Sequence, residues 1–224
     1  MAGRCGRSHL ATVSNARALV ILGHPRRRSL CGSIADAYAD SARSAGADAR
    51  VLALGDLDFD PVLRAGYQAP QPLEPDLVRA QESIAWATHV TWVYPVWWGA
   101  TPALLKGFLD RAMQPGWAFS ARPKGRPEGL LAGRSARLLI TMDAPGWFDR
   151  WFYAASARRS MQRATLWYTG FSPVRTRVFP EVLHADAARR SRWLERVRKD
   201  AEADLRLRSR GASAPLEARR EPAP

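Results

Sequence analysis

An eight-residue run near the start of the chain, ARALVILG at positions 16–23, constrains the fold most strongly. Continuous apolar runs of this length are typical of strands buried on both faces, as in parallel sheets. Four further strands are expected at residues 49–54, 89–94, 136–142 and 174–179. Because segments with helical spacing separate these strands, the sequence predicts a parallel sheet covered by helices on both faces.

The intervening segments carry helix signals. Helices are expected over residues 29–46 and 75–87, after Thr101, after the turn DAPGW up to about Trp167, and over 186–207. Thr101 is a suitable N-cap for the third helix, with Pro102 in its first turn. Residues 114–135 are expected to form a loop. Right-handed crossovers leave two common arrangements, Rossmann-like and flavodoxin-like.

The composition indicates one domain, because 224 residues with 46% hydrophobic content suffice for one sizeable core. We expect a flexible arm at residues 1–15, a domain at 16–208 and a disordered tail at 209–224. No apolar run approaches the roughly 18 residues of a membrane span. Two cysteines make no disulfide framework, which favours a cytoplasmic location. No Cys/His cluster has metal-ligand spacing, so no metal site is expected.

The net charge of +13 is concentrated at the two ends of the chain. Residues 1–28 carry six arginines and no acid, and residues 185–224 carry 11 basic and 7 acidic residues. Only three basic residues are lysine, and no nucleic-acid motif is present. A basic patch attracts polyanions nonspecifically, but we expect no nucleic-acid partner. The basic, acid-free start leaves a transit peptide as an alternative.

Ligands of open α/β sheets bind outside the carboxyl ends of the strands. Three turns of the chain are therefore candidates, at residues 23–31, 94–101 and 141–148. In the first, Ser29 and the arginines at 26–28 accompany a helix N-terminus, which suits a phosphate. The turn matches neither a P-loop nor a G-x-G-x-x-G motif. The alternative is an ordinary N-capped helix with solvated arginines.

The other two turns are rich in aromatic residues. Trp97 and Trp98 precede Gly99, which lets a backbone approach a ligand, and an indole can stack on a planar ring. Alternatively, both indoles pack under a loop or in a dimer interface. Asp143, in the third turn, either contacts a ligand or caps the helix that follows it. Of two histidines, His24 lies in a ligand-facing turn, whereas His89 begins a buried strand and is expected to be structural.

A phosphate site, a flat aromatic site and a closing loop together describe a pocket for flavin mononucleotide. The sequence here resembles the NAD(P)H:quinone oxidoreductase family of flavodoxin-like fold. The family pattern H-P-x-x-x-S-[FL]-[NC] matches residues 24–31, and the longer pattern [FY]-P-[LV]-x-W-[FG]-x-x-P-A-x-[LM]-K-G-[WF]-[LIF]-[DE]-R-[VA] matches residues 94–112. The resemblance implies a three-layer α/β/α sandwich with five parallel strands in the order 2-1-3-4-5.

The resemblance also implies a function. The chain would be a flavin-dependent oxidoreductase that transfers hydride from NAD(P)H via bound FMN to quinones or similar aromatic acceptors. FAD is the alternative cofactor, and a homodimer is expected. Relatives also include ancillary redox-regulatory flavoprotein subunits of transport systems, which is the alternative function. A nucleic-acid-associated protein with a vestigial fold is a third interpretation.

The resemblance assigns site residues position by position. Each of the three turns would contribute cofactor-binding residues. The first turn would contribute His24, Arg26, Ser29, Leu30 and Cys31, and the second Pro95, Val96, Trp97, Trp98 and Gly99. The third would contribute Met142, Asp143, Ala144 and Pro145. The substrate pocket would be formed by Trp98, Trp147 and Phe148, with Trp117 and Phe119 from a dimer partner.

No catalytic residue is certain, and the candidates are Trp98, Asp143 and Trp147. Some members of the family have a threonine- and glycine-rich third loop followed by a tyrosine and a histidine. Here the loop reads TMDAPGWF, and Tyr153 is present without such a histidine. The sequence therefore leaves the proton source open.

Overall fold

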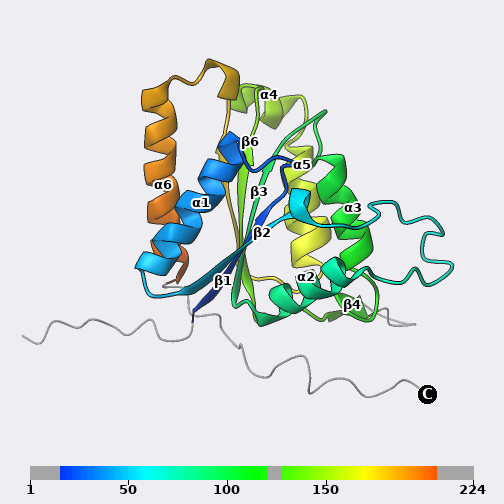
Figure 1. Cartoon of the computed structure of the whole chain (residues 1–224). Coiled ribbons are helices and arrows are strands. Elements are labelled where there is room, and N and C mark those ends of the chain that lie inside the picture. The colour runs from blue at the N-terminus through cyan, green and yellow to red at the C-terminus, as the bar shows by residue number, and fades with distance from the viewer. Residues whose placement is uncertain (1–15, 121–127, 206–224) are drawn as a thin grey trace, which may run out of the picture.

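The computed structural model describes residues 16–120 and 128–205. Its centre is a five-stranded parallel sheet in the order β2-β1-β3-β6-β7 (Figure 1). The strands are β1 (Arg17–Leu22), β2 (Asp48–Ala53), β3 (His89–Pro95), β6 (Ser135–Thr141) and β7 (Val174–Phe179). Numbered along the chain as five strands, this is the predicted order 2-1-3-4-5. The predicted fold class is confirmed.

Helices cover both faces of the sheet (Figure 1). One face is covered by α1 (Leu30–Ser44) and α6 (Ala187–Leu205), and the other by α2 (Pro75–Trp86), α3 (Ala103–Ala112) and the π-helix η2 (Ser160–Trp167). Short elements complete the fold, which are η1 (Leu54–Asp56), α4 (Gly146–Trp151), α5 (Ser156–Arg159) and η3 (Val182–His184). No helix in these two described stretches is long and apolar enough to cross a membrane.

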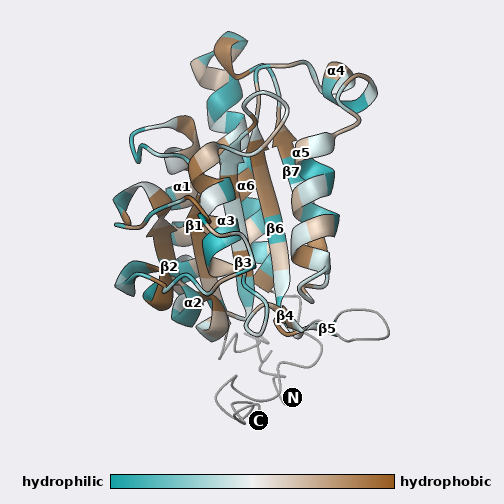
Figure 2. Ribbon diagram, turned by 90° about the vertical axis from the view of Figure 1, so that its right-hand side faces the viewer, coloured by the Kyte–Doolittle hydropathy of each residue, from teal (hydrophilic) through white to brown (hydrophobic). Residues whose placement is uncertain are grey.

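The central strand β1 shows why the first apolar run is continuous. Leu19 and Ile21 pack with the cluster that contains α2 and α3 residues, whereas Val20 and Leu22 pack with the cluster from α1 and α6. All four side chains are at most 2% exposed. Because both faces of the strand are buried, both sets of side chains must be apolar. Figure 2 shows the apolar residues concentrated in the strands between the two helical layers.

Several predicted boundaries need correction. The third helix begins at Ala103, so the cap position is occupied by Pro102 and not by Thr101. The expected loop at 114–135 contains a short antiparallel hairpin of β4 (Phe119–Ser120) and β5 (Glu128–Gly129). The helix expected up to Trp167 is divided into α4, α5 and η2. The predicted arm and tail lie outside the described residues.

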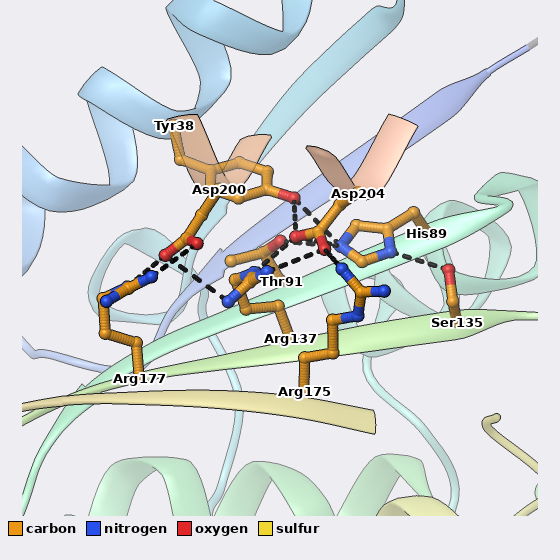
Figure 3. A network of polar contacts seen from close by, with 9 residues as sticks. All are labelled: Tyr38, His89, Thr91, Ser135, Arg137, Arg175, Arg177, Asp200 and Asp204. Carbon is orange, nitrogen blue, oxygen red and sulfur yellow. Dashed lines mark hydrogen bonds and ion pairs between the residues drawn. The ribbon is translucent and has the colours of Figure 1, made fainter. Parts of the chain in front are cut away.

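A buried polar network joins α6 to the amino ends of the strands, and the sequence did not predict it (Figure 3). Asp204, which is fully buried, accepts a hydrogen bond from the Tyr38 hydroxyl at 2.8 Å and forms a bidentate ion pair with Arg137. One helical turn earlier, Asp200 forms a bidentate pair with Arg177. These contacts attach the last helix to β6 and β7.

His89 completes this network as a neutral side chain. Burial is the largest effect on its pKa and lowers it to about 4, although the nearby Asp204 carboxylate favours the charged form. The Nδ1 atom lies 2.8 Å from the Ser135 hydroxyl, and Nε2 lies 3.0 Å from the Tyr38 hydroxyl. A serine, a histidine and an aspartate are thus close together, but each is at most 4% exposed. A substrate cannot reach them, so the arrangement is structural, as predicted for His89.

The long connection between η1 and α2 is held by one buried arginine. Arg111 is 0% exposed and forms a bidentate ion pair with Glu74 at 2.9 and 3.1 Å. It also donates a hydrogen bond of 2.8 Å to the Pro72 carbonyl oxygen. Gly107 on α3 permits this connection to approach the helix closely, because a Cβ at Gly107 would lie 2.4 Å from the Pro61 side chain. The connection is therefore fixed to α3.

The Asp204 network can be tested by removing one charge. We expect Asp204→Asn to lower the free energy of unfolding by about 3–5 kcal/mol, because the buried Arg137 guanidinium loses its bidentate carboxylate partner and keeps only the 3.4 Å contact with Asp200. Glu202→Gln, an exposed position on the same helix, is the control and is expected to change it by less than about 0.5 kcal/mol. Urea denaturation measures both. Equal effects of the two substitutions would contradict the importance of the network.

Candidate functional site

Three turns meet at the carboxyl end of the sheet, because β1, β3 and β6 are neighbours. The N–H of Gly23 donates to the Val93 carbonyl oxygen, and the N–H of Val96 donates to the Thr141 carbonyl oxygen, both at 2.8 Å. The rings of His24 and Trp97 pack edge to face, with centroids 5.5 Å apart. The structure therefore brings together the three predicted groups of cofactor-binding residues, near α4 in Figure 1.

The first turn ends in a well-formed helix cap. The Ser29 hydroxyl accepts a hydrogen bond from the Gly32 N–H at 3.1 Å and donates one to the Arg26 carbonyl oxygen at 2.9 Å. The first turn of a helix otherwise leaves its N–H groups without intrahelical partners, here those of Leu30 and Cys31. The Arg26 side chain is exposed. This end of α1 has the donors and the positive charge that a phosphate requires.

His24 stabilises the turn from within. Its Nδ1 accepts a hydrogen bond from the Arg26 N–H at 3.0 Å. Burial, the largest effect, lowers its pKa, and the nearby positive charge of Arg26 acts in the same direction. The imidazole is therefore neutral at neutral pH. It closes the turn and packs against Trp97.

Two glycines allow the first turn to fold tightly. A Cβ on Gly32 would lie 1.8 Å from the Arg27 carbonyl oxygen, and a Cβ on Gly55 would lie 2.1 Å from the Pro25 carbonyl oxygen. Neither position tolerates a larger residue without movement of the backbone. The Arg27 guanidinium also pairs with Asp56 at 2.6 Å. The turn is therefore held against both α1 and η1.

Cys31 faces away from solvent. Its Sγ lies 3.2 Å from the Thr141 Oγ1, and burial raises the pKa of the thiol to about 11. The thiol is protonated at neutral pH and is not a nucleophile. The side chain joins α1 to β6, so only its backbone can take part in the binding predicted from the sequence.

The second turn holds a tryptophan in an unusual conformation. Trp97 and Ala100 exchange two backbone hydrogen bonds of 3.0 Å, which leaves Trp98 and Gly99 as the two central residues. Both have positive φ, 52° and 68°, as in a type I′ turn. Left-handed backbone is unfavourable for a large residue other than glycine. The Trp98 side chain is fully exposed, whereas Pro95 is buried and Val96 is half-buried.

The third turn is hydrogen-bonded to the segment that follows β7. Met142 is buried and forms backbone hydrogen bonds with Phe179 and Val182. The Asp143 carboxylate accepts a hydrogen bond from the Leu183 N–H at 3.0 Å. Asp143 therefore does not cap the following helix, α4, as one of its two predicted roles required; it binds the backbone of η3, and its ligand role stays a prediction. Ala144 and Pro145 are half-buried and lead into α4.

Aromatic residues of the predicted substrate pocket divide into two locations. Trp147 and Phe148, on α4, pack together near the third turn, with ring centroids 5.7 Å apart. Phe119 packs against Tyr168, with ring centroids 5.0 Å apart. Trp117 and Phe119 both lie against the core cluster that contains the α2 and α3 residues. Figure 1 places β4 at the amino end of the sheet and α4 at the carboxyl end. Within one chain, Trp117 and Phe119 therefore do not reach the site.

Comparisons with known proteins agree with this architecture. A family model described as "Flavodoxin-like fold" matches residues 16–201. The chain is 31% identical over 128 residues to a Haemophilus influenzae protein described as an uncharacterized NAD(P)H oxidoreductase. That match covers 55% of this chain and 63% of the relative, so it spans less than two thirds of the relative's length.

Two solved structures share the fold. The NAD(P)H:quinone oxidoreductase from Methanothermobacter marburgensis aligns with a TM-score of 0.72 at 24% identity, covering 84% of this chain and 98% of that one. An FMN-dependent NADH-azoreductase from Bacillus anthracis in complex with FMN aligns with a TM-score of 0.66 at 17% identity, covering 87% and 100%. At these identities the likeness shows the fold alone.

The strained turn gives a prediction about stability. Trp98 is fully exposed, so replacing it removes no buried surface. We expect Trp98→Gly to be more stable than Trp98→Ala by about 1 kcal/mol, because only glycine adopts positive φ without strain. In urea denaturation, the free energy of unfolding of both variants should stay close to that of the wild type. A loss of several kcal/mol in both would show that the indole belongs to the core.

Proposed function

Because the chain belongs to the family with the flavodoxin-like fold, we propose that it is a flavin-dependent oxidoreductase. It transfers hydride from NAD(P)H via bound FMN to quinones or similar aromatic acceptors. The proposal depends on one observation. The N-terminus of α1 and the exposed indole of Trp98 both lie at the carboxyl ends of adjacent parallel strands. The similarity to a relative described as an NAD(P)H oxidoreductase supports it.

The residues at the first turn fit the phosphate of the cofactor. The N-terminus of α1 offers the N–H groups of Leu30 and Cys31, and the Arg26 side chain adds positive charge. The Ser29 hydroxyl is engaged with Gly32 and Arg26, so its contribution is to hold the turn in shape. Backbone groups therefore provide most of this site.

The second and third turns fit the flat part of the cofactor. Gly99 has no side chain to block approach to the backbone of the turn, and residues 142–145 would form the opposite side. The flavin ring would supply the redox chemistry, as cofactors of this kind do. The chain positions its reactants, and the indole of Trp98 provides a surface for stacking, worth about 0.5–1.5 kcal/mol beyond burial. Trp147 and Phe148 help to exclude water.

We propose FMN in preference to FAD. The β1–α1 turn is pressed against η1 by the Arg27–Asp56 ion pair and by the contact between Gly55 and Pro25. This leaves one helix N-terminus as the phosphate site, which matches a single phosphate. The FMN named in the Bacillus anthracis azoreductase structure is consistent with the choice. The cytoplasmic location stays a prediction from the cysteine content.

A homodimer is part of the proposal. Trp117 and Phe119 contribute to a substrate pocket only if a second copy presents them, because they lie at the other end of their own sheet. Large exposed aromatic side chains next to the site, namely Trp151, Phe152 and Tyr153, offer a surface for that copy. Sedimentation equilibrium should then give twice the chain mass of 24.9 kDa, whereas a mass of one chain would refute the dimer.

The proposed function is tested first by the visible spectrum of the purified protein. We expect a yellow protein that releases FMN on heating, identified by chromatography against FMN and FAD standards. With NAD(P)H and a soluble quinone, the loaded protein should turn over without a partner. A colourless protein that takes up no added flavin would overturn the proposal. Bound flavin with poor turnover would favour the ancillary-subunit function instead.

A further inference from the structure

We propose that Ser156 is a positioning residue that fixes the orientation of the Trp98 indole over the site. Its hydroxyl, at the start of α5, donates a hydrogen bond of 2.7 Å to the Gly99 carbonyl oxygen. Residues 99 and 156 are far apart in sequence, so this bond ties the second turn to a separate element. The catalytic part of the inference rests on the proposed function.

The orientation of Trp98 depends on its backbone. The indole is fully exposed, so no burial in the described chain holds it in place. The two hydrogen bonds between Trp97 and Ala100 close the turn, and the Val96 N–H and the His24 ring hold its first half to the sheet. A restraint on Gly99, the next residue, holds the second half of the turn and with it the backbone from which the indole projects. Ser156 supplies that restraint from outside the turn.

The segment that carries Ser156 is itself firmly held. The Ala155 N–H donates to the Asp149 carbonyl oxygen at 2.8 Å, and the Ser156 N–H donates to the Tyr153 carbonyl oxygen at 2.9 Å. The Tyr153 ring lies against Gly99, since a Cβ there would be 3.8 Å from its Cδ1 atom. The hydroxyl is thus presented by an anchored backbone and not by a free loop end.

Backbone strain is concentrated where these two segments meet. Positive φ occurs at four non-glycine residues of the described chain, and three of them are Trp98, Ala154 and Ala155. Each such residue costs free energy and persists only where its surroundings determine it, most often at functional sites. Two strained segments joined by one short hydrogen bond are consistent with an arrangement retained for the placement of Trp98.

The experiment compares Ser156→Ala with Ser156→Thr, which keeps the hydroxyl. Ser83→Ala is the matched control, because the Ser83 hydroxyl also donates to a backbone carbonyl oxygen, at 2.8 Å on α2. The first readout needs no cofactor. The indole N–H resonance of Trp98 is assigned by its absence in Trp98→Ala, and its heteronuclear NOE reports the order of the ring. We expect the NOE to fall in Ser156→Ala alone.

The second readout is kinetic. In the flavin-loaded protein, Ser156→Ala should raise the quinone KM about threefold to tenfold. This is the change in affinity that corresponds to the net free energy of one hydrogen bond. The kcat and the flavin content should stay near those of wild type, and Ser156→Thr should restore the KM. An unchanged NOE in Ser156→Ala would overturn the proposal, as would an unchanged KM. If wild type binds no flavin, the proposed function fails, but the NOE still decides whether Ser156 orders Trp98.

Discussion

Parallel pairing of β1, β3 and β6 is the constraint on which the rest of the molecule depends. It requires every connection to cross over a face of the sheet, so both faces are covered and almost all side chains of these three strands are buried. It also brings all carboxyl ends to one edge. Three turns distant in sequence thereby become neighbours, and the candidate site follows from topology before any side chain is considered.

The two ends of the sheet have different physical roles. At the amino end, Asp204, Arg137 and a neutral His89 form a buried network in which each group has a partner (Figure 3). Buried charges of this kind are stable only when paired, so they fix α6 in one position. At the carboxyl end the backbone is strained at Trp98 and aromatic side chains are exposed. The sheet thus separates a buried, fully paired network from exposed side chains on strained backbone.

Much of the fold could be predicted because its signals are local. Apolar runs and caps such as Ser29 depend on neighbouring residues, and both were recognised in the sequence. The buried network could not be predicted, because Asp200 and Asp204 on a charged helix look like solvated residues until Arg137 and Arg177 are placed opposite them. The local signals were arginines inside two predicted strands, Arg137 in 136–142 and Arg177 in 174–179.

The site itself was predictable in position but not in detail. The sequence placed Trp98 on a turn, but its left-handed backbone and its tie to Ser156 depend on where α5 lies. Likewise, Asp143 binds the Leu183 N–H, a partner 40 residues away. Long-range contacts of this kind have no pattern in a single sequence.

Most of the proposed cofactor contacts come from backbone groups, at the start of α1 and in the second and third turns. Such groups are fixed by the sheet and do not depend on side-chain identity. The loop TMDAPGWF can therefore depart from relatives if its path is preserved, and the Asp143–Leu183 bond preserves that path. Under the proposed function, the exposed side chains of Trp98 and Trp147 would then contribute to the choice of flat acceptor, while backbone groups would hold most of the flavin.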